Sequence, residues 1–176
     1  LGVCREVIDD CHPRFIGVLG GRYGWVPEGR GHSITADEIH YGVLEREAEK
    51  RGHAFFYFRK ETDTLAIPEA DARSGGYREY AQPDEIKRYG QEKADAMARE
   101  RDAKLADLKQ SIIDERLPVF IYDAKWDAAQ QRLTRLEAFG NQVHTDLFKS
   151  LKNDSKLAAR FADGAGARHA GNDSPH

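Results

Sequence analysis

The sequence predicts an α/β fold in which helices flank a parallel sheet. Three short stretches are apolar through their middle: FIGVLG at 15–20, HAFFYFR at 53–59 and LPVFIYD at 117–123. Such continuous apolar runs are typical of strands that are buried on both faces. Segments with helical periodicity separate the runs, and this alternation is typical of parallel βα units. We therefore expect three adjacent parallel strands with helices on both faces of the sheet.

The first predicted element is a helix that ends at Pro13. Its apolar residues recur at helical spacing, at positions 1, 3, 4, 7, 8 and 11. The chain begins with Leu1 inside this helix. We therefore expect an amino-terminally truncated domain whose sheet lacks at least one strand. Such a domain is expected to leave a sheet edge or an apolar helix face uncovered.

The second helix is expected from about Thr35 to Arg51. Residues 35–38 read TADE, which has the form of a capping box. In that motif the Thr35 hydroxyl accepts a hydrogen bond from the amide of residue 38, and the Glu38 carboxylate accepts one from the amide of Thr35. Ile34 and Ile39 occupy the positions of a hydrophobic staple. The pattern predicts that the helix begins near Thr35.

Residues 60–104 are predicted to form a polar insertion with a projecting helix. Residues 60–84 are rich in turn formers and predict no regular element. A charged helix is expected at 84–116, and its first part is expected to project from the fold, because an apolar stripe appears only at Leu105, Leu108 and Ile112. A final helix is predicted from a stripe at Leu133, Leu136, Phe139, Val143, Leu147 and Leu151.

The domain boundary is expected at residue 152. Residues 1–152 contain every predicted helix and strand. Residues 153–176 become rich in Gly, Ala, Ser, Asp and His, a composition typical of a disordered tail or linker.

The charge balance limits the partners of the chain. Its 176 residues carry 27 Lys and Arg against 30 Asp and Glu, for a net charge of −3. This balance does not provide the strongly positive surface that binding to a nucleic acid or an anionic membrane requires. No apolar run reaches the length of a membrane-spanning helix. A protein partner or a small substrate is therefore favoured, with no nucleic acid and no membrane.

The two cysteines indicate a reducing environment. Cys4 and Cys11 lie in the first predicted helix and are separated by roughly 10 Å along its axis, so they cannot form a disulfide with each other. Two buried thiols and no signal peptide favour a cytoplasmic location. Cys4, Cys11 and His12 lack a fourth ligand at any zinc spacing, so no metal site is expected.

The candidate site lies in the loop and helix that follow the first strand. Ligands of open α/β sheets bind outside the carboxyl ends of the strands, where LGGRYGWVP at 19–27 is expected. Glu38 can stabilise an oxocarbenium-like centre on a ribose, and Arg22, Tyr23 and Trp25 carry groups that can hold a nucleotide by stacking on its base. Each has a structural alternative, because Glu38 can cap the helix and the two aromatic side chains can fold back on the sheet edge.

Several of these stretches also resemble a known family. CREVIDDCHPRFIGVLGGRYGWVP, SITADEIHYGVL, AFFYFR, KLADLKQSI, PVFIYDAKWD and LEAFGNQVHTDL occur in this order. Together they resemble the TIR-like amino-terminal domain of nephrocystin-type and telomerase-associated NACHT and WD-repeat proteins, which are STAND-type NTPases with bacterial relatives. The resemblance implies a flavodoxin-like module that precedes a nucleotide-driven signalling ATPase. The chain contains no G-x-x-x-x-G-K-[ST] motif, so that ATPase is expected outside it.

The resemblance leaves two functions open, beside that of a scaffold without activity. The first is a cytoplasmic signalling or effector module, for example in innate defence, that acts by self-association or by binding a protein partner and requires no cofactor. The second is an NAD glycohydrolase, because Glu38 matches by position the catalytic glutamate of NAD-cleaving TIR domains. In that case NAD is the substrate, Glu38 is the catalytic carboxylate, and Arg22, Tyr23 and Trp25 hold the nucleotide.

Overall fold

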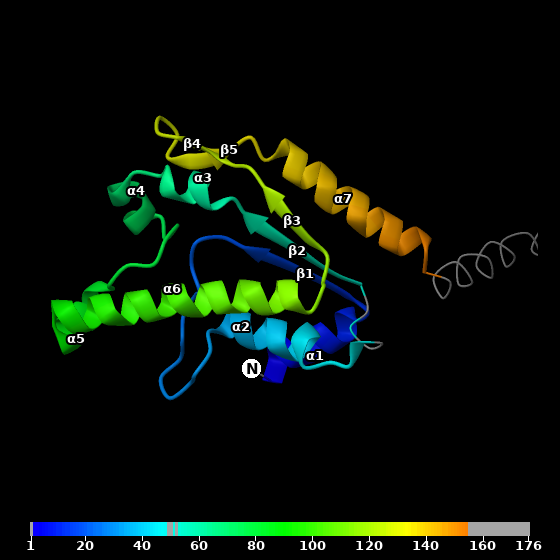
Figure 1. The fold of residues 1–176 in the computed structure, drawn as a ribbon, viewed down its shortest axis with the longest axis horizontal. Helices are drawn as coiled ribbons and strands as arrows, with labels where there is room; N and C mark the ends of the chain where they lie inside the picture. The colour runs from blue at the N-terminus through cyan, green and yellow to red at the C-terminus, as the bar shows by residue number, and fades with distance from the viewer. Residues whose placement is uncertain (1, 49–50, 52, 155–176) are drawn as a thin grey trace, which may run out of the picture. The chain divides into compact units, whose positions relative to one another are not determined.

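A three-stranded parallel sheet lies at the centre of the fold (Figure 1). The structure is a computed structural model that describes residues 2–48, 51 and 53–154. The strands are β1 (Arg14–Leu19), β2 (His53–Arg59) and β3 (Val119–Tyr122), in the order β1-β2-β3. Both pairings are parallel, which confirms the predicted α/β class and the three adjacent strands. Helices flank this sheet, an arrangement consistent with a flavodoxin-like fold.

The hydrophobic core lies on one face of the sheet. Helix α2 (Ile34–Ile39), the π-helical turn η1 (His40–Leu44) and helix α6 (Gln91–Asp114) cover this face. The stripe predicted in the charged helix is confirmed, because its three apolar residues are all buried in the core. The cluster consists of Leu19, Tyr23, Ala36, Ile39, Val43, Ala54, Phe56, Phe58, Leu105, Leu108 and Ile112.

The second helix begins near Thr35 as predicted, but it ends earlier than expected. It begins at Ile34, and its last turn is the π-helical segment that ends at Leu44. A Cβ on Gly42 in this turn would lie 2.7 Å from Cε2 of Phe15, so glycine allows the turn to pack closely on β1. Of the residues predicted to extend this helix to 51, positions 49 and 50 lie outside the described part of the chain.

Helix α1 (Gly2–Cys11) precedes β1 and contacts both β1 and η1. Its cysteines are both free, as expected. The prediction that both thiols are buried is wrong, because Cys11 is exposed and Cys4 is only partly buried. Cys11 is the last residue of the helix, where a side chain that satisfies the apolar spacing can extend past the packed surface.

The prediction that residues 60–84 contain no regular element is wrong. Two short helices, α3 (Glu61–Leu65) and α4 (Glu69–Ser74), lie in this segment. Each is too short to show a helical stripe in the sequence. Short helices gain most of their stability from tertiary packing. Thr64, Ile67 and Ala72 of this segment are buried and supply that packing.

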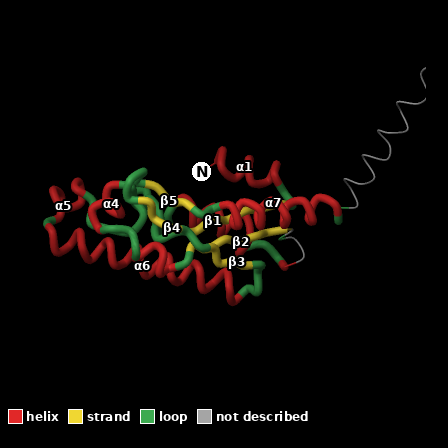
Figure 2. The backbone as a smooth tube through the Cα atoms, turned by 90° about the horizontal axis from the view of Figure 1, so that it is seen from above, coloured by secondary structure: helices red, strands yellow, loops and turns green. Residues whose placement is uncertain are grey.

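The predicted charged helix is divided into α5 (Pro83–Tyr89) and α6. The break occurs at Gly90, whose φ of 85° no helix interior accommodates. Figures 1 and 2 both show α5 folded against the first part of α6. Ala94 and Ala98 in that part are buried, so the first part of α6 is packed and not fully solvated. Their small side chains gave only a weak hydrophobic signal.

The last predicted helix begins later than its stripe. Leu133 lies in a hairpin formed by β4 (Lys125–Asp127) and β5 (Arg132–Thr134), which pair antiparallel. Helix α7 (Glu137–Lys152) follows. The chain divides into two compact units, Leu1–Leu136 and Glu137–His176. The predicted tail falls almost wholly on residues 155–176, outside the described residues. No helix within residues 2–48, 51 and 53–154 is long and apolar enough to span a bilayer.

Candidate functional site

The loop that leaves the carboxyl end of β1 begins with Gly20 and Gly21. A Cβ on Gly21 would lie 2.6 Å from Cγ2 of Thr64 and 2.6 Å from the carbonyl oxygen of Tyr77. Only glycine therefore fits, and the loop backbone forms a parallel bridge with Arg78. The glycine pair allows segments far apart in the sequence to meet at this end of the sheet.

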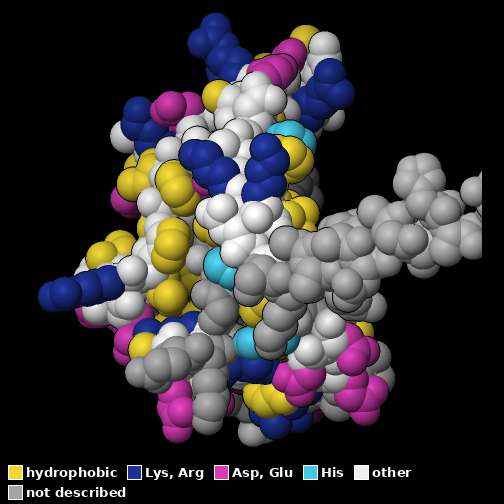
Figure 3. Space-filling view, turned by 90° about the vertical axis from the view of Figure 1, so that its right-hand side faces the viewer, with side chains coloured by type: hydrophobic (Ala, Val, Ile, Leu, Met, Phe, Trp, Pro, Cys, Tyr) yellow, Lys and Arg dark blue, Asp and Glu magenta, His cyan; other side chains and the backbone are white. Residues whose placement is uncertain are grey.

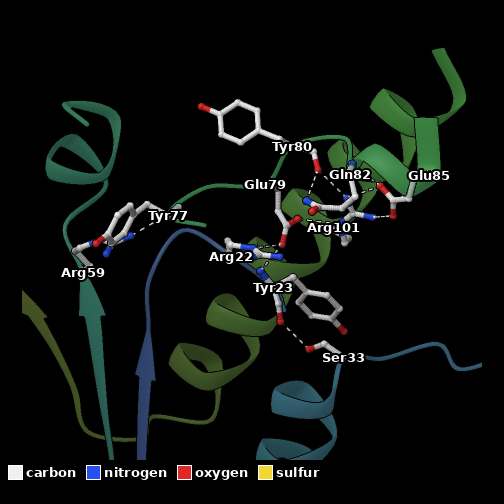
Figure 4. A network of polar contacts seen from close by, with 10 residues as sticks. All are labelled: Arg22, Tyr23, Ser33, Arg59, Tyr77, Glu79, Tyr80, Gln82, Glu85 and Arg101. Carbon is white, nitrogen blue, oxygen red and sulfur yellow. Dashed lines mark hydrogen bonds and ion pairs between the residues drawn. The ribbon is translucent and has the colours of Figure 1, made fainter. Parts of the chain in front are cut away.

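A buried carboxylate then fixes the loop (Figure 4). The Glu79 side chain is fully buried, and its Oε1 accepts a hydrogen bond of 2.9 Å from the Tyr23 amide. Its Oε2 accepts one of 2.8 Å from Nε of Arg101. Nε of Arg22 lies 3.8 Å from Oε1. The carboxylate is thus compensated by two guanidinium groups and one amide, as a buried charge requires.

Arg101 joins this carboxylate to the start of α5. Its guanidinium donates to both Glu85 oxygens, at 2.6 and 3.1 Å, and to the Tyr80 carbonyl at 3.1 Å. Burial alone would lower the pKa of Arg101, but its hydrogen bonds to Glu85 and Glu79 raise that pKa above the usual value. Glu85 also accepts from the Gln82 amide at 3.0 Å. One arginine therefore ties α6 to the segment before α5.

The amino-terminal cap of α2 is Ser33, so the predicted capping box of Thr35 and Glu38 is wrong. The Ser33 side chain is fully buried and accepts from the Ala36 amide at 3.2 Å. Its hydroxyl also donates to the Tyr23 carbonyl at 2.7 Å. Serine is as good a cap as threonine, and burial against the Tyr23 loop favours Ser33. Thr35 is consequently an exposed residue of the first turn.

The structure brings two of the four candidate residues together in a cleft. Arg22 and Trp25 line a cleft of about 680 Å³ between the loop and α5–α6. The prediction that Trp25 folds back on the sheet is wrong, because 71% of its surface is exposed. Tyr23 is instead buried in the core, with its hydroxyl 3.1 Å from Nδ1 of His32. Burial also raises the Tyr23 pKa.

Glu38 lies apart from the cleft. It is a partly exposed residue of α2, and it lines neither the cleft beside Trp25 nor the cleft described next. Its carboxylate has no hydrogen bond or ion pair within the described part of the chain. Because Ser33 caps the helix, the predicted contact of the Glu38 carboxylate with the Thr35 amide is not formed.

A second cleft, of about 470 Å³, lies directly outside the carboxyl ends of β1 and β2. Gly20 and Gly21 form one side of it, and Arg59, the last residue of β2, lines it with Arg78 and Lys109. Nζ of Lys109 donates to the Gly20 carbonyl at 2.8 Å. This is the position at which open α/β sheets bind ligands.

The chain matches, over residues 1–164, a family model described as a domain of unknown function, DUF4062. It is a member of the DUF4062 family. No curated protein and no solved structure matches it.

Sequence reasoning missed the residues that organise this DUF4062 domain at the carboxyl end of its sheet. Glu79 meets Tyr23 across 56 positions of sequence and Arg101 across 22, and such pairings leave no periodic pattern. The sequence does contain a signal for two cations, Arg59 and Lys109, because each lies within an apolar pattern. Arg59 ends the buried strand HAFFYFR, and Lys109 follows Leu108 inside the apolar stripe of α6. A charge at either position indicates a special environment.

Proposed function

We propose that this DUF4062 domain is an interaction module of a larger signalling protein and acts by associating with a second copy of itself or with a protein partner. The resemblance to the TIR-like domains of STAND-type NTPases supports a position beside a nucleotide-driven ATPase in the cytoplasm. The association itself is supported by exposed apolar surface in two parts of the structure.

The observation that carries the proposal is the open edge of β1. This strand is the first in the sheet order and pairs on one side only, with β2, among the residues that the structure describes. Its sequence, RFIGVL, carries a charge only at Arg14 and contains no proline. Ile16 and Val18 are 39% and 50% exposed. An apolar edge without protecting charges is a template for pairing with another chain.

The second part is the loop that presents Trp25. Its backbone is fixed by the hydrogen bond from the Ile34 amide to the Trp25 carbonyl, at 3.2 Å, and by the Glu79 contacts of Tyr23. A rigid loop with an exposed tryptophan loses little entropy on binding, and tryptophan is enriched among residues that dominate binding energy. Exposed hydrophobic side chains also lie among charged ones on the face shown in Figure 3.

Sedimentation velocity over a range of concentrations tests the association. We expect the wild-type chain to associate as concentration rises. Val18→Lys should weaken this association by about tenfold or more, because it places a charge on the pairing edge. Val7→Lys is the matched control, since Val7 is 54% exposed on α1, and it should leave the association unchanged. A wild-type chain that stays monomeric throughout would contradict self-association, and equal behaviour of both variants would move the contact away from β1.

The free carboxylate of Glu38 favours a second candidate function, cleavage of NAD. A carboxylate with no internal partner is available to stabilise a developing ribosyl cation. The test is to incubate the full-length protein with NAD and to measure free nicotinamide. Glu38→Gln is expected to leave the melting temperature nearly unchanged, because the side chain is partly exposed and forms no hydrogen bond or ion pair with the described residues.

The same variant separates this candidate from the first. If Glu38 is catalytic, Glu38→Gln abolishes nicotinamide release, while Glu47→Gln, a nearby carboxylate change, retains it. Full-length wild-type protein that releases no nicotinamide under activating conditions would contradict NAD cleavage and leave the interaction module standing.

A further inference from the structure

The cleft outside β1 and β2 differs from the cleft beside Trp25 in how its cations are compensated. Each cation that lines the Trp25 cleft forms an ion pair. These cations are Arg22, Arg30, Arg88, Arg101 and Lys104. By contrast, Arg59, Arg78 and Lys109 form no ion pair with any carboxylate that the structure describes. The hydrogen-bond partners of the three cations at the carboxyl ends of the strands are instead neutral groups.

Arg59 is the most buried of the three cations, with 8% of its surface exposed. Its guanidinium donates to Oγ1 of Thr64 at 2.8 Å and to the Tyr77 carbonyl at 3.2 Å. Both partners are neutral, so they orient the group without cancelling its charge. Isolated buried charges are costly unless they are paired, and a guanidinium held this way can bind an oxyanion.

Lys109 approaches the same place from α6. One of its ammonium donors goes to the Gly20 carbonyl. The ammonium also lies 5.6 Å from the centroid of the Phe58 ring, and the described residues supply no hydrogen-bond acceptor for its other two donors. A Cβ on Gly20 would lie 3.1 Å from Nη2 of Arg59, so both cations lie beside this glycine. Burial lowers the pKa of Lys109, and the charge of Arg59 lowers it further. A bound anion would relieve both effects.

Arg78 completes the set. Its Nη2 donates to the Ile67 carbonyl at 3.1 Å, again a neutral partner. Its Nε is buried and has no hydrogen-bond partner in the described part of the chain. Buried donors without partners are rare in native proteins, and each requires an explanation.

The acidic residues of this cleft form no ion pair with its three cations in the described part of the chain. Glu79 is already compensated by Arg101 and Arg22. The other two acids, Glu61 and Asp102, are both exposed to solvent.

We propose that this cleft is a binding site for a small phosphorylated molecule, whose phosphoryl oxygens would be held by Lys109, Arg59 and Arg78. The site stands on three cations whose hydrogen-bond partners are neutral and on its place at the strand ends, and it is independent of the association through β1. A volume of about 470 Å³ is within the usual range of small-molecule sites. The glycine pair allows a ligand to approach the backbone closely.

Isothermal titration calorimetry of the whole chain with pyrophosphate, at constant ionic strength, tests the proposal. We expect saturable binding, weaker binding of inorganic phosphate, and an increase in melting temperature with pyrophosphate. Citrate, as a carboxylate of comparable charge, distinguishes phosphate recognition from general attraction of anions. No saturable binding of pyrophosphate, or equal binding of citrate and pyrophosphate, would overturn the proposal.

Three variants place the ligand. Lys109→Met should weaken pyrophosphate binding by about tenfold or more, whereas Lys109→Arg should retain most of it. Lys104→Met is the matched control, because Lys104 lies on the same helix and lines the other cleft, and it should bind like the wild type. Loss of binding in Lys104→Met but not in Lys109→Met would place the anion in the cleft beside Trp25 and would overturn the proposal. Should Lys109→Met fail to fold, Arg78→Met supplies the same test.

Discussion

Replacing Arg101 by methionine is expected to lower the free energy of unfolding by about 3–5 kcal/mol, because it leaves a buried carboxylate without its main partner. The Glu79 side chain is fully buried, and Arg101 contacts it at 2.8 Å. The other cation, Arg22, is more distant and partly exposed. Methionine preserves much of the volume of the arginine stem, so the loss reports charge compensation. Chemical denaturation of the purified chain measures it.

Two further variants separate the buried charge from the helix itself. Arg99→Met changes an exposed arginine of the same helix and should alter stability by less than about 0.5 kcal/mol. The double variant Arg101→Met with Glu79→Gln should recover part of the loss, because the buried group is then neutral and can still accept from the Tyr23 amide. A double variant as unstable as Arg101→Met alone would mean that the arginine stabilises α6 by packing and not through Glu79.

This network bears on the proposed association because it fixes the loop that presents Trp25. Glu79 holds the Tyr23 amide, and Ser33 holds the Tyr23 carbonyl. The loop is therefore fixed at its centre by Glu79, which lies between α4 and α5, and by Ser33, the cap of α2, while Trp25 remains exposed. Loss of Arg101 is expected to loosen that loop before it unfolds the sheet, so association through Trp25 would weaken along with stability.

The central sheet could be predicted from the sequence because its signal is local. Each strand is a short apolar run, and β2 has the predicted bounds of 53–59. The helices of 61–74 could not be predicted in this way. They are five and six residues long. A few of their side chains are buried against the rest of the fold, and this packing stabilises them. The break at Gly90 was equally hidden, because both sides of it carry helix-forming residues.

The candidate site was predicted only in part. Position in the fold predicted a site in the loop after β1, and Arg22 and Trp25 of this loop line a cleft. The role of Glu38 was predicted from a capping box that begins at Thr35. Two residues that precede Glu38 can serve as the helix cap. Ser33 and Thr35 can both cap a helix, and the choice depends on which one the Tyr23 carbonyl can reach. That contact joins residues ten positions apart, so no local pattern contains it.

Ser33→Ala is expected to destabilise the chain by about 2–4 kcal/mol, the combined cost of a lost helix cap and of a buried carbonyl left without a donor. Both losses follow from one hydroxyl, which accepts from the Ala36 amide and donates to the Tyr23 carbonyl. Thr35→Ala is the matched control. Thr35 is exposed in the first turn of α2, where alanine is the better helix former, so stability should stay the same or rise slightly. Denaturant unfolding of the two variants compares them directly. A large loss in Thr35→Ala with none in Ser33→Ala would return the cap to Thr35 and, with it, the capping role to Glu38.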